Sequence, residues 1–161
     1  MTGRFPPLVA EALAEAGWSP EGRDDDRGRE WALRIAAHAT SGGRQHVMTA
    51  AAVAAYAEFG GLRVQPRGEG EQIAPSEFHL DPFLVRQSVE TLAELAEAIG
   101  APLSPLGEEG GGTGILAVDA QGRVFVLDHT GDWFLGADLD EAITGLVLGR
   151  QPQRMDRDGG W

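Results

Sequence analysis

The residues best suited to chemistry are four histidines, some of which lie beside acidic side chains. His79 and Asp81 form a His-x-Asp pattern, and His129 directly follows Asp128. A metal site needs several ligands that converge on one point, and these spacings do not place three ligands together. The sequence therefore predicts no metal site, and it contains no motif that indicates a bound cofactor.

Two glutamates and a glycine-rich run are the next candidates. Glu108 and Glu109 are adjacent, so in a strand they would point to opposite faces and could not act together as glycosidase carboxylates do. The run 107–114 is rich in glycine, but it precedes a strand, whereas a phosphate-binding loop opens a helix. We interpret the glutamates as charges at the rim of the fold and assign no catalytic residue.

Cysteine and lysine are both absent from the 161 residues. Without cysteine there are no disulfides, thiolate nucleophiles or thiolate zinc sites. Without lysine there is no Schiff-base chemistry and no phosphate-loop lysine. Serine-elbow and zinc-deaminase patterns are missing too, so composition and motifs together favour a binding protein.

The charge is strongly negative and unevenly distributed. Residues 1–60 carry eight acidic and six arginine side chains, a formal charge of −2, whereas residues 61–161 carry 17 acidic and seven arginine side chains, a charge of −10. Such a surface repels nucleic acid and anionic lipid and attracts basic proteins. An acidic surface can also serve solubility alone.

Aromatic residues surrounded by acids are the best candidates for contact with a partner. Trp133 lies in the segment DHTGDWFLGAD, and we expect it at an exposed corner. Tryptophan is enriched among residues that anchor protein interfaces. The predicted partner-binding residues are Trp133, Asp128, Asp132, Asp138 and Asp140.

The hydrophobic pattern predicts the elements that position these residues. Apolar spacing predicts helices over about residues 5–16, 24–38, 48–59, 81–99 and 138–148, and strands near 62–64, 78–80, 115–118 and 124–127. The last two strands form a hairpin across Gly122, and Gly61 takes a positive φ where a helix gives way to a strand. Asp81 and Asp138 are expected to cap the helices that follow them, and Gly149 to end the last helix. The polar segment 66–77 is expected to be a surface loop, and the alanine-rich face of 48–59 permits close packing against a neighbouring helix. The fold class is α+β, a mainly antiparallel sheet packed with N-terminal and intervening helices.

The size of the chain suits a single domain, since about two thirds of the unfolded surface of such a chain can be buried on folding. We expect that domain over residues 1–150, followed by a loose, polar C-terminal tail over 151–161. No apolar run approaches the roughly 20 residues of a membrane helix, and no secretory signal is recognisable. The expected location is the cytoplasm, with no membrane and no nucleic acid as partner.

Several short motifs together resemble one family over roughly residues 8–150. They are Gly17-Trp18 with Pro20 and Arg23, Phe59-Gly60-Gly61-Leu62, Asp81-Pro82, Pro105-Leu106-Gly107-Glu108, Asp119 with Gly122-Arg123-Val124, and Leu135-Gly136. In order and spacing they are similar to the third group of the SUKH superfamily of immunity proteins. The resemblance implies an antitoxin that binds and neutralises the toxin of a bacterial polymorphic toxin system.

The acidic half of the chain suits a basic toxin, such as a nuclease or a nucleic-acid deaminase. We expect the protein to act as a monomer or weak homodimer. Two alternatives stay open: a cytoplasmic regulatory or scaffolding module of the same fold, and a small hydrolytic enzyme with Glu108, His79 or His129 as general base. A deep pocket with converging titratable groups would favour the enzyme.

Overall fold

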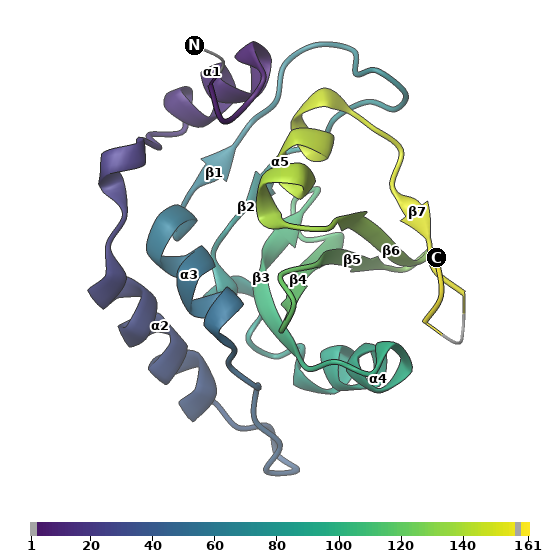
Figure 1. Cartoon of the computed structure of the whole chain (residues 1–161). Coiled ribbons are helices and arrows are strands. Elements are labelled where there is room, and N and C mark those ends of the chain that lie inside the picture. The colour runs from purple at the N-terminus through teal and green to yellow at the C-terminus, as the bar shows by residue number, and fades with distance from the viewer. Residues whose placement is uncertain (1–2, 157–158) are drawn as a thin grey trace.

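The computed structural model describes residues 3–156 and 159–161, which form seven β-strands and five α-helices (Figure 1). The strands are β1 (Arg63–Val64), β2 (Phe78–His79), β3 (Leu103–Glu109), β4 (Gly114–Asp119), β5 (Val124–Asp128), β6 (Gly131–Gly136) and β7 (Gln153–Arg154). The helices are α1 (Pro7–Glu15), α2 (Asp25–Ala37), α3 (Ala50–Phe59), α4 (Val89–Ile99) and α5 (Leu139–Leu148). All neighbouring strands are antiparallel and follow chain order across one sheet, which confirms the predicted α+β class.

Helices cover both faces of this sheet, and each face has its own apolar core. In Figure 1, α5 lies above the central strands and α4 below them. Residues such as Leu116 and Val126 face α1, α3 and α5 in the larger core. Their strand neighbours Ala117 and Phe125 face α4 in the smaller one. Apolar side chains on both faces explain why the two hairpin strands lack a polar face in the sequence.

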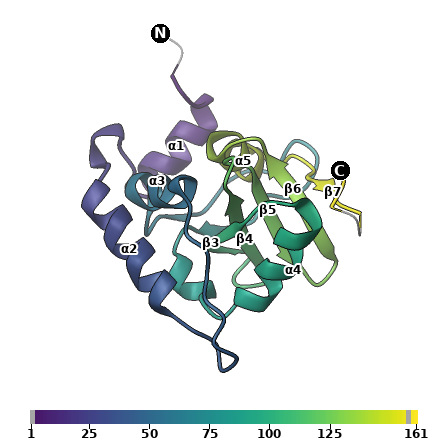
Figure 2. The ribbon, with the colours of Figure 1, turned by 60° about the horizontal axis from the view of Figure 1, so that its bottom comes forward.

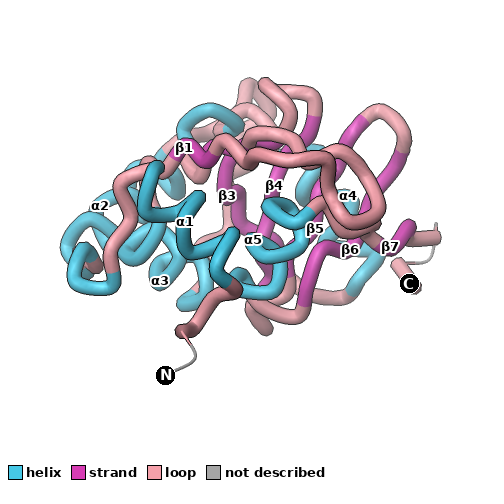
Figure 3. Tube along the Cα trace, turned by 90° about the horizontal axis from the view of Figure 1, so that it is seen from above, coloured by secondary structure: helices cyan, strands magenta, loops and turns pink. Residues whose placement is uncertain are grey.

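The N-terminal helices form an outer layer. Figure 2 shows α2 alongside α3, and Figure 3 shows α1 beside α5 over the sheet. The α2–α3 contact is close because Gly28 faces alanine-rich α3: a Cβ at Gly28 would lie 2.6 Å from the Val53 carbonyl oxygen and 2.9 Å from the Ala57 Cβ. The small side chains of α3 thus act as the sequence predicts, permitting a close approach of two helices.

The helix expected from Asp81 to Ile99 is interrupted, and that prediction was wrong in one respect. A 3-10 turn, Pro82–Val85, precedes the separate helix α4. Phe83 in the turn packs edge-on against Trp31 of α2, with ring centroids 5.2 Å apart. Because α4 covers the opposite face of the sheet, the chain must change direction between the two, which a continuous helix could not do. The predicted cap is confirmed, as Asp81 accepts a hydrogen bond from the Phe83 backbone N–H.

Two strands and the C-terminal segment differ from expectation. The sequence pattern did not predict β3 or β6, which flank the expected hairpin on either side. The expectation of a loose segment after residue 150 was wrong for its described part, because β7 pairs with β6 and Met155 is buried in the smaller core. Trp161 also stacks on Phe134, with ring centroids 4.7 Å apart. These apolar contacts are distant in sequence and carry no local periodicity.

Other local predictions are confirmed. The β4–β5 hairpin forms, and Gly61 has a φ of +91° between α3 and β1. Asp138 caps α5 by accepting a hydrogen bond from the Glu141 backbone N–H at 2.8 Å, and Gly149 ends that helix in the left-handed conformation. Within the described residues, no helix is both long and apolar enough to cross a lipid bilayer.

Candidate functional site

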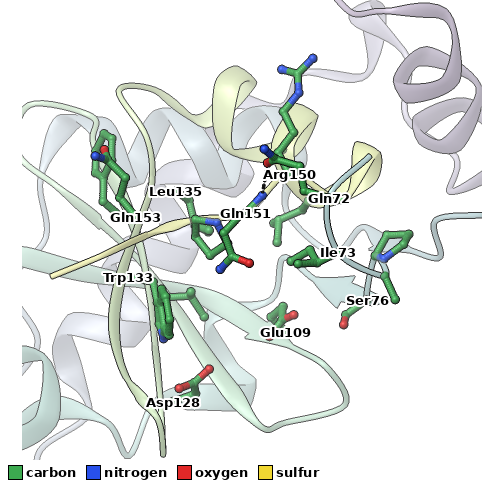
Figure 4. A pocket seen from close by; sticks show the side chains of 18 of the residues that line it. Gln72, Ile73, Ser76, Glu109, Asp128, Trp133, Leu135, Arg150, Gln151 and Gln153 are labelled. Atoms are coloured by element: carbon green, nitrogen blue, oxygen red, sulfur yellow. Dashed lines mark hydrogen bonds between the residues drawn. The ribbon is translucent and has the colours of Figure 1, made fainter. Parts of the chain in front are cut away.

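A groove of about 480 Å³ lies over the larger-core face of the sheet, beside α5 (Figure 4). One wall is the loop segment 72–76, another is the end of α5 with residues 149–153, and the floor includes Val126, Trp133 and Leu135. The volume is within the usual range for binding pockets. We call this hollow the β6 groove.

The wall loop is held in place by its backbone. The N–H groups of Gln72 and Ile73 both donate to the Gly149 carbonyl at 2.9 Å, and the Gln151 N–H donates to the Gln72 side-chain oxygen at 2.6 Å. Ile73 is nevertheless 40% exposed. The segment was predicted as a surface loop, which is confirmed, but its role as a wall of a groove was not foreseen.

Trp133 lies in β6 and is half-buried, so the expectation of an exposed corner was wrong. Its position opposite Val126 of β5 places the ring against the larger core and at the floor of the groove. The indole N–H donates to the Thr130 hydroxyl at 3.3 Å. The guanidinium of Arg154 lies over the ring, 5.4 Å from its centroid. The tryptophan thus presents an aromatic surface at a built site.

Two carboxylates adjoin Trp133 in the groove, those of Asp128 and Glu109 (Figure 4). Burial raises the pKa of Glu109, nearby Asp128 adds to the rise, and a hydrogen bond with the Ser76 side chain opposes it. Burial would also raise the pKa of Asp128, but hydrogen bonds from Thr130 and Trp133 outweigh it and hold that pKa below its ordinary value. The floor therefore holds an ionised aspartate beside a glutamate that is costly to ionise.

The remaining three predicted residues lie elsewhere. Asp132 is on the other face of β6, because successive residues of a strand point to alternate faces. Burial raises the pKa of Asp132 most, and the negative charges of Asp128 and of Glu94 in α4 raise it further. Asp138 is the exposed cap of α5. Asp140 forms an ion pair with Arg4, with Oδ2 and Nε 2.5 Å apart. The structure thus brings together Trp133 and Asp128 and separates them from the other three.

Glu109 is the residue of the groove that sequence reasoning missed. The adjacency rule was sound, because Glu108 and Glu109 line different hollows. Without β3, however, the sequence could not reveal which face each occupies or that Asp128 lies nearby. Ile73 and Leu146 were also missed, because their positions depend on the packing of the loop against α5.

The residues proposed as bases of a small enzyme are divided between two places. His79 and Glu108 are directly opposite each other on β2 and β3 and line a hollow of about 280 Å³ beside the Arg63–Glu77 ion pair. His129 lies in the exposed turn between β5 and β6. Across residues 3–156 and 159–161, no group of three potential metal ligands is placed to hold an ion.

One of the four histidines is buried. His46, for which the sequence indicates no metal site, lies in the loop before α3, where its Nε2 is 2.6 Å from the Arg86 carbonyl oxygen. Burial lowers the pKa of His46, an effect that the nearby carbonyl opposes. It connects the α2–α3 loop to the 3-10 turn and is a structural residue.

The comparisons with known proteins point in one direction. The family model for the SUKH-3 immunity protein matches residues 5–149, which is most of the chain and contains strands β1–β6 and helices α1–α5. No curated protein and no solved structure matches the chain. The extent of the family match is decisive: the chain belongs to the SUKH-3 immunity protein family.

Proposed function

We propose that this immunity protein neutralises a basic, nucleic-acid-acting toxin domain in the bacterial cytoplasm by binding it, without catalysis. The immunity role follows from the family. The observation that supports a basic partner is the acidic groove, where Glu109 and Asp128 adjoin Trp133. Residues 61–161, which build all seven strands, carry a formal charge of −10.

Charge complementarity gives a physical reason for this choice. A nuclease or nucleic-acid deaminase must present basic side chains to phosphates, and those side chains are what an acidic protein attracts. The long-range attraction speeds encounter, whereas a small apolar and aromatic centre slows dissociation. The β6 groove combines both features on one face.

Competition for the same cations explains neutralisation without chemistry. If the acidic face of the immunity protein covers the toxin's nucleic-acid-binding surface, substrate is excluded by both bulk and charge. The charges in the β6 groove suit such a role. Among the described residues, the charged side chains that line it are Glu109, Asp128, Glu141 and Arg150, and Arg150 forms an ion pair with Glu71 at 2.9 Å.

The test is co-expression with the C-terminal domain of a secreted protein encoded beside this gene. We expect rescue of growth and a stable complex whose association slows as salt rises from about 0.05 to 0.5 M, because salt screens exposed charges. Trp133→Ala should mainly speed dissociation. A toxin domain that stays lethal and unbound at full expression of the immunity protein would refute the proposal.

A further inference from the structure

We propose that the β6 groove receives a single arginine side chain from an extended segment of the partner, its guanidinium lying against Trp133 between the carboxylates of Glu109 and Asp128. The inference rests on the proposed function in taking the toxin as the source of that arginine. It adds a defined binding site and the chemical group that the site recognises.

The negative charge of Glu109 and Asp128 is unbalanced within the part of the chain that the structure describes. Among the described residues, neither Glu109 nor Asp128 takes part in an ion pair, although nine such pairs form elsewhere in the described chain. The one cation of the groove lining, Arg150, is directed to Glu71. Figure 4 shows Arg150 at the far end of the groove from Asp128. A cation from outside would complete the site.

Trp133 offers an aromatic surface on which a guanidinium can stack. A guanidinium is planar and weakly hydrated, so it stacks on tryptophan and accepts two carboxylates better than an ammonium does. The protein's own Arg154 already lies over Trp133 and donates to the Thr130 carbonyl oxygen at 2.7 Å. This contact shows that the indole of Trp133 can stack with a guanidinium. Arg154 forms no ion pair with Glu109 or Asp128.

The lining of the groove also suits the shape and polarity of an arginine side chain. Ile73, Leu135 and Leu146 line the groove and offer apolar contact for the methylene chain of an arginine. Ile73 is held by the hydrogen bonds of its loop to Gly149, so little ordering is required on binding. A groove that combines these apolar side chains with two carboxylates matches the methylene chain and the guanidinium of one arginine side chain.

A close approach at the floor supports a built site. Gly114 of β4 lies under Glu109: a Cβ there would be 3.0 Å from the Glu109 carboxylate and 2.8 Å from Val126. The glycine therefore lets the Glu109 side chain lie flat along the sheet. A side chain at position 114 would force the Glu109 carboxylate to shift from this position.

The experiment uses the whole protein and a capped glycyl-arginyl-glycine peptide, with the citrulline peptide as its neutral isostere. Two-dimensional NMR should show saturable shifts of the Trp133 indole and of the Glu109 and Ser76 amides with the arginine peptide. The citrulline peptide should leave them unchanged. Equal shifts with both peptides, or no saturable shift at this groove, would overturn the inference.

Matched variants separate the groove from general charge. Glu109→Gln should weaken peptide binding roughly tenfold or more, since a half-buried charge partner is lost. Glu108→Gln removes the same charge from the same strand but from the opposite face, and we expect less than about a twofold change because its carboxylate lines a different hollow and solvent screens its charge. Asp128→Asn, inside the groove, and Asp132→Asn, on the other face of the sheet, form a second matched pair on neighbouring strands. Equal losses within each pair would refute the site.

The toxin domain gives the final readout. If it binds the wild type and Glu109→Gln weakens binding while Glu108→Gln does not, the arginine site is the toxin contact. If it binds and both variants behave alike, the inference fails and the proposed function stands. If it does not bind but the arginine peptide does, the proposed function fails and the site remains.

Discussion

Replacing Asp119 by alanine should unfold the protein at a much lower denaturant concentration, because this carboxylate is fully buried and has three hydrogen-bond partners. It accepts from the backbone N–H groups of Gln121 and Arg123, both at 2.9 Å, and from the Arg123 Nε at 2.6 Å. Its exposed fraction is 0%. These bonds form the turn of the β4–β5 hairpin, and Arg123 in turn lies over the Trp161 ring.

The magnitude follows from what the substitution leaves behind. Two backbone donors lose their acceptor, which costs about 1–3 kcal/mol for each one left buried. Breaking a fully buried ion pair by removing one partner costs about 3–5 kcal/mol, and the cost here lies toward the lower end because the Arg123 side chain is 23% exposed. The two figures overlap, so we expect a loss of about 3–5 kcal/mol, and a fall in the melting temperature of roughly 6–20 °C for a chain of this size.

Urea unfolding followed by tryptophan fluorescence measures this loss, and an unchanged m-value would show that the unfolded state is the same. Asp119→Asn keeps one acceptor oxygen and should lose less. Asp138→Ala is the exposed control, since it removes a similar side-chain bond to the Glu141 backbone at 2.8 Å and should cost about 1 kcal/mol. An Asp119→Ala loss no larger than that of Asp138→Ala would refute the reasoning.

Gly61→Val should cost about 1–3 kcal/mol because φ is +91°, where a β-branched residue is strained; an unchanged melting temperature would contradict this. Tyr56→Phe should cost about 1–3 kcal/mol, since the buried hydroxyl donates to the Pro105 carbonyl oxygen at 2.5 Å and leaves it unpaired when removed; urea unfolding is the measurement. Glu109→Gln should raise the melting temperature at pH 7. Burial is the main cause of the raised pKa of Glu109, which means that the ionised carboxylate is unfavourable in the folded state. That gain should shrink as pH falls from above the raised pKa to below the ordinary value of 4.5, because the folded and unfolded glutamates are both largely protonated only below 4.5. A gain independent of pH would show that ionisation of Glu109 is not its cause.

The stability gain of Glu109→Gln would itself support a functional role. A carboxylate that destabilises the free protein but strengthens binding is typical of a site arranged for a partner. Glu108→Gln on the other face of β3 is the control, because it changes the net charge equally. If both variants gained the same stability, general charge repulsion would explain the result.

Local patterns in the sequence were sufficient for the elements whose signals are short in range. Helical spacing and end residues located α1, α2, α3 and α5 closely, and the Asp119–Gly122 turn located the β4–β5 hairpin. Capping and left-handed glycines depend on interactions within a few residues, so a single chain is enough to predict them. The absence of cysteine and lysine also limits the possible chemistry through composition alone.

The sequence by itself determined the class of fold, the acidic character and the family resemblance, because composition, periodicity and motif order are properties of the linear chain. Only the tertiary structure decided where the acids lie. It paired Asp140 with Arg4, left Asp132 on the α4 side, and placed Glu109 and Asp128 together beside Trp133. The physical reason is strand registry: side chains alternate between faces, and which residues meet across a sheet is set by pairing between segments far apart in sequence.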